Sequence, residues 1–260
     1  MKYKIDLHTH FSTNGHVYST IEENIRAALG KNLELIAITN HGPAYIDSGH
    51  WTSIKNIEVI PSRIESLTIL KGVEANFLDE EGNLDINNAI YQNMDLILAG
   101  FHDLKIKNNF LKNRESCTKA LLAAIEQNIL DIIAHPGNPL YPFDYYEVLK
   151  AAKLKNIAIE INNSSFRYNR IGSEETCPII IEIAKELDMF ISIGSDSHIS
   201  YDIGKMDISE KLIKKYKIDE NKVLNSSQDI LYQFIENRKI QKPSTLKSKY
   251  NLNDFAYLNY

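Results

Sequence analysis

Histidine and acidic residues recur in this 260-residue chain where short apolar runs end. The first run, Tyr3–Leu7, leads into His8-Thr9-His10, and residues two apart on a strand point to the same side. One His-x-His pair is a weak signal, because such a pair also arises by chance on a surface. Imidazole and carboxylate groups together are ligands for zinc, manganese or iron, so a metal site is our first hypothesis.

Six of the apolar runs supply residues of this kind. The candidate metal ligands are His8, His10, His16, His41, Glu74, His102, His135, Asp196 and His198. If the runs are parallel strands of one barrel, their C-terminal ends meet at one mouth, where the active sites of such barrels lie. This set exceeds the need of one tetrahedral ion and suits two or three catalytic ions.

Metal ions held by these ligands indicate hydrolysis. A cation lowers the pKa of bound water from about 15.7 to about 7, and the resulting hydroxide can attack phosphorus in line with the leaving oxygen. Glu74 and Asp196 are the acidic members of the catalytic set, and we expect Glu74 to bridge two ions. A phosphate also needs a fixed cation. Arg170, with Arg167 as a second candidate, follows the one strand run that supplies no ligand.

Two further residues lie close to the ligands in the sequence. Asp6 shares the expected strand face of His8, so it either orients the imidazole from behind or is a charge at the edge of the strand. His50, beside the single Trp51, is interpreted as a loop or lid residue rather than a ligand.

Strand-like runs alternate with helical patterns along the chain, and these elements have to position the ligands. Seven strands are expected at Tyr3–Leu7, Leu33–Thr39, Thr68–Glu74, Asp95–Phe101, Asp131–Ala134, Ile157–Asn162 and Phe190–Gly194. Helices are expected at Thr20–Gly30, Glu115–Asn128, Asp144–Lys153 and Glu174–Leu187. For the first helix, Ser19 or Thr20 is the expected N-cap and Gly30 the expected C-cap.

When each strand leads into a helix, the strands pair in parallel and are joined by right-handed crossovers. The simplest closure is a single-domain, TIM-like α/β fold, a (β/α)7 barrel, although an open doubly wound sheet fits the same pattern. We expect the barrel to occupy residues 1–240. The polar, tyrosine-containing segment 241–260 is expected to be a C-terminal tail rather than a second domain.

The composition and net charge limit the kinds of partner that the protein is expected to have. The net charge of −5, from 29 Lys and Arg against 34 Asp and Glu, argues against a basic nucleic-acid surface. The polar N-terminus lacks the pattern of a signal peptide, and no apolar run reaches the roughly 18–20 residues of a membrane helix. The two cysteines cannot build a disulfide framework, so we expect a cytoplasmic protein without a membrane partner.

The ligand motifs resemble those of the polymerase and histidinol phosphatase (PHP) family, in the family's order. They read His8-x-His10, His16, Thr-Asn-His41-Gly, Gly-Val-Glu74, Phe-His102-Asp, His135-Pro-Gly and Gly-Ser-Asp196-Ser-His198. The segments Glu160–Phe166 and Arg170–Glu174 resemble the YcdX-like phosphatase branch in particular. The resemblance extends from about Lys4 to about Arg238, so segment 242–260 lies beyond it.

This resemblance implies a trinuclear site on a distorted seven-stranded barrel. The first ion would take His8, His10, Glu74 and Asp196, the second His16, His41 and His198, and the third His102, His135 and the shared Glu74. The ligand types make zinc the expected metal for these three ions, with manganese or iron as alternatives. The resemblance also implies a small homo-oligomer.

We therefore expect a metal-dependent phosphoric ester hydrolase, a phosphatase acting on small phosphomonoesters. Three alternatives remain: a PHP-type nuclease or exonuclease acting on phosphodiesters, an amidohydrolase-like metal hydrolase, and a non-catalytic, metal-stabilised scaffold. The acidic charge argues against the nuclease. An amidohydrolase would not cluster His16, His41 and His198, and structural zinc sites usually stop at four ligands.

Overall fold

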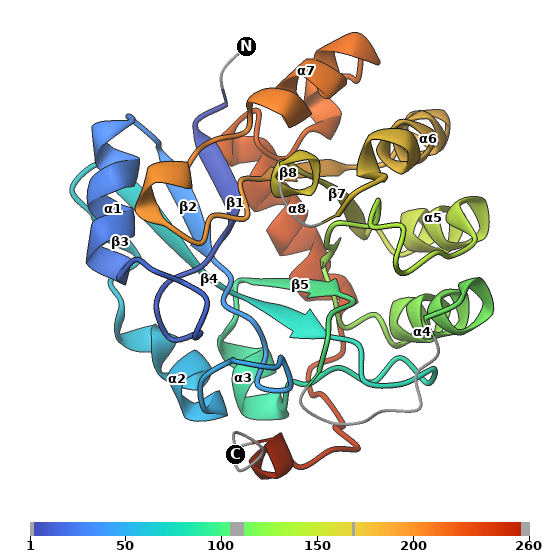
Figure 1. The fold of residues 1–260 in the computed structure, drawn as a ribbon, viewed down its shortest axis with the longest axis horizontal. Helices are drawn as coiled ribbons and strands as arrows, with labels where there is room; N and C mark the ends of the chain where they lie inside the picture. Colours follow the sequence, from blue (N-terminus) through green and yellow to red (C-terminus); the bar gives the residue numbers. More distant parts are fainter. Residues whose placement is uncertain (1–2, 105–111, 168–169, 256–260) are drawn as a thin grey trace.

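The computed structural model describes residues 3–104, 112–167 and 170–255, and Figure 1 shows strands ringed by helices. Seven strands pair in parallel in the order β1, β2, β4, β5, β6, β7, β8. They are β1 Ile5–Thr9, β2 Leu35–Ile38, β4 Leu67–Asn76, β5 Leu96–Gly100, β6 Ile132–Ile133, β7 Ala158–Asn162 and β8 Ile191–Gly194. A parallel bridge between Thr9 and Ser197 joins the first strand to the segment after the last. The fold is therefore the predicted seven-stranded barrel and not an open sheet.

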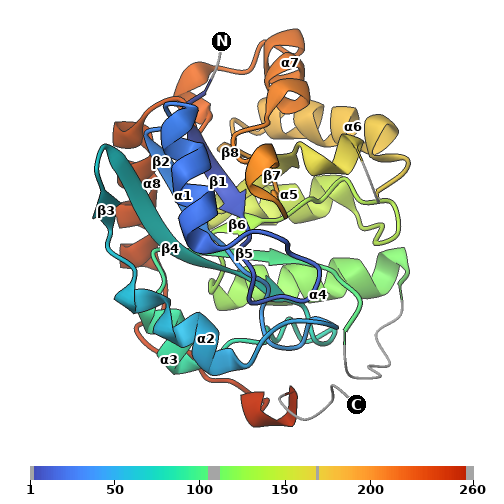
Figure 2. The same ribbon diagram turned by 60° about the vertical axis from the view of Figure 1, so that its left-hand side comes forward.

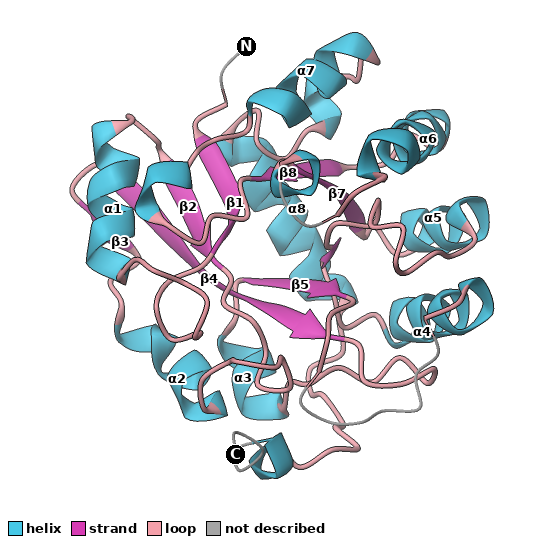
Figure 3. Ribbon diagram, in the orientation of Figure 1, coloured by secondary structure: helices cyan, strands magenta, loops and turns pink. Residues whose placement is uncertain are grey.

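Helices surround the strands on the outside (Figures 2 and 3). They are α1 Ile21–Gly30, α2 Trp51–Lys55, α3 Asn88–Asn93, α4 Arg114–Gln127, α5 Tyr145–Leu154, α6 Ser173–Glu186, α7 Asp207–Lys215 and α8 Gln228–Gln241. A short strand, β3 Arg63–Ile64, pairs antiparallel with β4 outside the ring. Helices and strands alternate as the sequence pattern predicts.

Helix α8 closes one end of the barrel. Its Leu231 and Phe234 share a buried apolar cluster with Ile5, Leu35 and Leu96, which are the first residues of β1, β2 and β5. The helix therefore covers the end at which the strands begin. The opposite end, where the strands finish, is left for polar residues.

The first strand contains a β-bulge. Between Asp6 and Thr9, β1 advances three residues while its partner β2 advances two. The extra residue breaks the strict alternation of side chains, so Leu7 packs in the interior cluster and the adjacent His8 also reaches the barrel interior. The expectation that Asp6 shares a face with His8 is therefore wrong.

Local signals predict the start of α1 better than its end. Thr20 is the N-cap and forms a capping box with Glu23. Gly30, in contrast, is the last helical residue, and Lys31 occupies the cap position. Helices α2, α3, α7 and α8 lie outside the helices that the sequence predicts. Of these, α2 and α3 have five and six residues, too few to show a helical period.

The described part of the C-terminal segment, residues 242–255, packs against α2 and α3. The Trp51 Nε1 donates a hydrogen bond to Asn253 Oδ1 at 2.9 Å, and the Tyr91 hydroxyl donates one to the Pro243 carbonyl at 2.8 Å. The tail is thus docked on the barrel over these residues. Within the described ranges, no helix has the length and apolar character needed to span a membrane.

Candidate metal centre

The nine candidate ligands gather at the barrel end where the strands finish. His8 lies on β1 and Glu74 on β4, while His10, His16, His41, His102, His135, Asp196 and His198 lie in the segments that follow β1, β2, β5, β6 and β8. Six of them are buried, and His16, His102 and His198 are partly exposed. Tertiary folding thus brings the whole set, spread over 191 positions from His8 to His198, into one cluster.

Glu74 lies between two groups of imidazoles. Its Oε1 is 2.6 Å from His135 Nε2 and 3.2 Å from His102 Nε2. Its Oε2 is 2.8 Å from His41 Nδ1 and 3.3 Å from His8 Nε2. A carboxylate whose two oxygens face different donor groups has the arrangement needed to bridge two cations.

The remaining imidazoles approach one another in pairs. The Nε2 atoms are 3.1 Å apart in His8 and His10, and 2.9 Å apart in His16 and His198. His102 and His135 form a third pair at 3.1 Å. Asp196 Oδ1 lies 3.1 Å from His10 Nε2, beside the first pair.

The donor set fits divalent cations. His41 Nδ1 and Glu74 Oε2 are buried and 2.8 Å apart, yet neither has a hydrogen-bond partner among the described residues. Buried polar atoms left without partners are costly in an ordinary core. Two lone-pair-bearing atoms that face the same space are, in contrast, what a cation of the zinc type requires.

The pKa values of most of the cluster also match metal ligation, which requires neutral imidazoles and ionised carboxylates. His8 is the exception: burial lowers its pKa, but its three carboxylate neighbours outweigh burial and hold that pKa well above its usual value. Burial lowers the pKa of His10 to about 4, and the nearby His198 lowers it as well. Burial likewise lowers the pKa of His135 to about 4. Burial alone would raise the pKa of Glu74, but His8 and its other histidine neighbours outweigh this and hold that pKa well below its usual range.

A residue without a predicted role, Glu160 of β7, supports the ligands from behind. Its Oε1 lies 2.8 Å from His8 Nδ1, and its Oε2 accepts a hydrogen bond of 2.8 Å from the backbone N–H of His135. Asp6 does not contact an imidazole. It accepts hydrogen bonds from the backbone N–H groups of Ser195 and Gly204. Both interpretations of Asp6, as a residue that orients an imidazole and as a charge at the edge of the strand, are therefore wrong. The available signal for Glu160 was an acidic residue within an otherwise apolar strand.

The backbone has an unusual conformation at two of the candidate ligands. His135 and Asp196 have φ values of 33° and 52°, in the left-handed region that non-glycine residues seldom occupy. Close approach also requires glycine nearby. A Cβ atom on Gly100 would lie 2.6 Å from His135 Cε1, and one on Gly194 would lie 2.3 Å from His8 Cβ.

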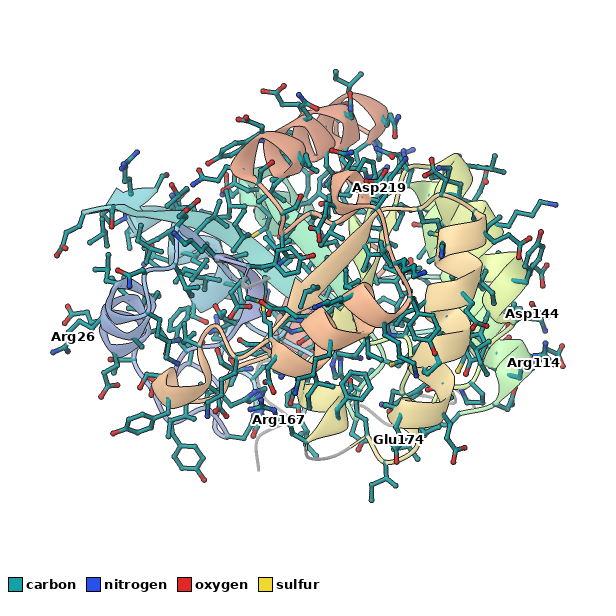
Figure 4. The ribbon with its side chains drawn as sticks, turned by 90° about the horizontal axis from the view of Figure 1, so that it is seen from above. Arg26, Arg114, Asp144, Arg167, Glu174 and Asp219 are labelled. Atoms are coloured by element: carbon teal, nitrogen blue, oxygen red, sulfur yellow. The ribbon has the colours of Figure 1, made fainter. Side chains whose placement is uncertain are left out.

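The two candidate arginines differ in position. The Arg170 Nη1 donates to Asp196 Oδ2 at 2.9 Å, and Arg170 lines a cavity of about 610 Å³ together with His16, His41, His102, Asp196 and His198. Arg167, which Figure 4 labels, forms an ion pair with Asp207 instead. His50 lies outside the cluster and caps the N-terminus of α2.

Known proteins resemble this chain in sequence over most of its length. No family model matches it. It is 44% identical over 239 residues to a probable phosphatase of Thermoanaerobacter sp. (strain X514), covering 92% of this chain and 97% of that protein. It is 45% identical over 235 residues to a probable phosphatase of Caldanaerobacter subterraneus subsp. tengcongensis, covering 90% and 92%.

Solved structures share the fold, among them a histidinol phosphate phosphatase. The histidinol phosphate phosphatase of Lactococcus lactis, crystallised with zinc, L-histidinol and phosphate, superposes with a TM-score of 0.56 at 19% identity. The match covers 83% of this chain and 94% of that one. At this identity the likeness establishes the barrel fold alone.

Proposed function

The chain belongs to the family of these bacterial probable phosphatases, and from this premise we propose that it hydrolyses small phosphomonoesters at a trinuclear metal site. The position of Glu74 carries the proposal, because its two oxygens face separate groups of imidazoles. The order of the ligand motifs along the chain supports membership of the PHP family, and the segments Glu160–Phe166 and Arg170–Glu174 support its YcdX-like branch.

The three histidine pairs support three metal positions. One ion would lie between His8, His10, Glu74 and Asp196, a second between His16, His41 and His198, and a third between His102, His135 and Glu74. We propose zinc, since nitrogen and oxygen ligands without thiolate suit it, and manganese or iron would use the same donors. The metal ions would supply a water molecule acidified to near neutral pH and positive charge against the phosphate oxygens.

The residues of the chain have separate tasks in this reaction. The ionised carboxylates of Glu74 and Asp196 would bind the metal ions at the floor of the cavity, and Arg170 would orient the phosphate. Among the described residues, the hydrogen bonds of the Arg170 guanidinium all use Nη1, so Nη2 and Nε are left to donate to phosphate oxygens.

The test combines metal analysis with a phosphatase assay on the wild type and Glu74→Ala. We expect about three metal ions per wild-type chain, with hydrolysis of p-nitrophenyl phosphate exceeding that of a labelled single-stranded oligonucleotide or an amide substrate. Glu74→Ala should lose metal and activity. Glu126→Ala, an exposed change on α4, is the control and should lose neither. Wild-type activity in Glu74→Ala would refute the bridging role.

A further inference from the structure

The cavity above the ligands has walls that the reaction at phosphorus does not use. Three of its lining residues expose apolar side chains to an unusual degree: Tyr18 is 81% exposed, Leu140 59% and Ile46 57%. Tyr18 and Ile46 come from the loops after the neighbouring strands β1 and β2, and Leu140 comes from the loop after β6, on another part of the ring. Apolar side chains clustered around a cavity are typical of ligand-binding grooves rather than of ordinary surface.

Aromatic rings extend this apolar surface down toward the ligands. The ring of Tyr45 lies parallel to the His41 imidazole, with 4.0 Å between the centroids and 6° between the planes. The rings of Phe101 and Tyr141, which also line the cavity, stack with 5.3 Å between their centroids. The cavity is therefore polar at the floor, and its walls combine aromatic and aliphatic side chains with a few polar ones.

The charges of the described lining residues do not favour a second anionic group on the substrate. Among the described lining residues, Arg170 is the one lysine or arginine, and it lies at the floor against Asp196. The other charged lining residues outside the histidines are Asp103 and Asp202, which form ion pairs with Lys112 and Lys205. A substrate with a diphosphate chain or a carboxylate near the mouth would meet no counter-charge from these residues.

The cavity is also larger than a phosphate group needs. At about 610 Å³ it is in the range of pockets that enclose a whole small molecule. A phosphate held at the metal floor by Arg170 would leave the space between Tyr18, Tyr45 and Leu140 for the group attached to it.

We propose that the substrate is a monophosphate ester of an aromatic alcohol, with its ring held between the mouth residues Tyr18, Ile46 and Leu140. This inference rests on the proposed function. In the reaction the bond between phosphorus and the ester oxygen breaks, and water provides the new oxygen on phosphorus. A proton passes to the ester oxygen, so the products are phosphate and the neutral alcohol. Aromatic rings gain both buried area and favourable ring–ring contacts in such a site.

Phosphonates that cannot be hydrolysed test the proposal without interference from leaving-group reactivity. Isothermal titration of the zinc-loaded enzyme would give dissociation constants for benzylphosphonate and methylphosphonate. We expect the wild type to bind benzylphosphonate at least about 10-fold more tightly, a difference of about 1.4 kcal/mol. The double variant Tyr18→Ser/Leu140→Ser should reduce this preference to about 3-fold or less.

A matched control is available on α5, where Tyr146 and Leu154 are 46% and 80% exposed and lie outside the cavity lining. Tyr146→Ser/Leu154→Ser should keep the wild-type preference. Equal affinities for the two phosphonates in the wild type, or an unchanged preference in the mouth variant, would overturn the aromatic assignment and leave the phosphatase proposal standing. Failure of the zinc-loaded wild type to bind either phosphonate or inorganic phosphate would overturn both.

Discussion

The two buried glutamates of the centre have different neighbours, although both lie on strands. Glu74 faces the ring nitrogens that point into the cluster, whereas Glu160 contacts the Nδ1 of His8 from outside it. A carboxylate at Nδ1 fixes the tautomer that leaves Nε2 free for a metal. Glu160 also holds the backbone N–H of His135, so one side chain positions two candidate ligands.

Glu160→Gln should therefore lower metal affinity without removing a ligand. Loss of such a supporting contact typically costs 10–100-fold in affinity, and we expect a decrease in this range. Competition with a chelator of known affinity would measure it. Glu126→Gln, with a side chain that is 84% exposed, is the control. Unchanged metal affinity in Glu160→Gln would show that the contact has no positioning role.

Arg170 and Arg167 form a natural pair for testing phosphate binding. Arg170 lies against Asp196 in the cavity, and Arg167 pairs with Asp207 away from it. Hydrogen bonds to charged groups contribute about 1.5–3 kcal/mol, so Arg170→Ala should raise the KM for p-nitrophenyl phosphate about 10- to 100-fold. Arg167→Ala should change it little. Steady-state kinetics of both variants decide the matter, and equal KM values would refute the assignment.

At the scale of elements, α8 is attached to the barrel through a buried ion pair. Arg238 of α8 is 1% exposed, and its Nε donates to Asp131 Oδ1 at 3.2 Å just before β6. Its Nη2 donates to the carbonyl of Leu130 at 2.6 Å. Helix α8, which covers the end of the barrel where the strands begin, is thus held by this ion pair as well as by the packing of Leu231 and Phe234.

Arg238→Met should destabilise the fold, because it removes one of the two cations that face the buried Asp131 carboxylate; the other, Lys242 Nζ, lies 2.9 Å from Asp131 Oδ2. Hydrogen bonds to charged groups contribute about 1.5–3 kcal/mol, and urea unfolding would measure a loss of this size. Arg26→Met changes an exposed arginine of α1, labelled in Figure 4, and should alter the free energy of unfolding by less than about 0.5 kcal/mol. A similarly small effect for Arg238→Met would mean that apolar packing alone holds α8.

At the scale of the whole molecule, the formal charge of −5 misrepresents the mouth. It counts the carboxylates of Glu74 and Asp196 but no metal ion. With three divalent ions bound, as proposed, these two carboxylates and the ions would together change from −2 to +4. An acidic protein would then present a positive site to an anionic phosphate, because local charge governs the attraction of a substrate.

Removal of metal should lower the stability of the whole fold, since the ligands come from segments around the entire ring. A ligand present at 1,000 times its dissociation constant stabilises the native state by about 4 kcal/mol. For a chain of this size that corresponds to a decrease in Tm on the order of 10 °C after chelation. Differential scanning calorimetry before and after chelation, and again after zinc is restored, would measure it. An unchanged Tm would argue against metal ions at the centre.

The sequence by itself determined the elements and the ligand candidates. Hydrophobic periodicity is a local property, so it placed the strands within a few residues of their observed bounds. Residue chemistry is equally local, and it selected His8, Glu74 and the other seven candidates from their types and strand-end positions. The sequence pattern did not predict helix α8 or the end of α1 correctly.

Only the tertiary structure decided which of these groups meet. The bulge in β1 separates Asp6 from His8, and Glu160, 152 residues away along the chain, takes the supporting position behind His8. Closure of the ring likewise gives Glu74 its two sets of neighbours and places Tyr18 and Leu140 around one cavity. These contacts join residues far apart in the chain, and no local pattern encodes them, because they depend on how the strands pair and how the barrel closes.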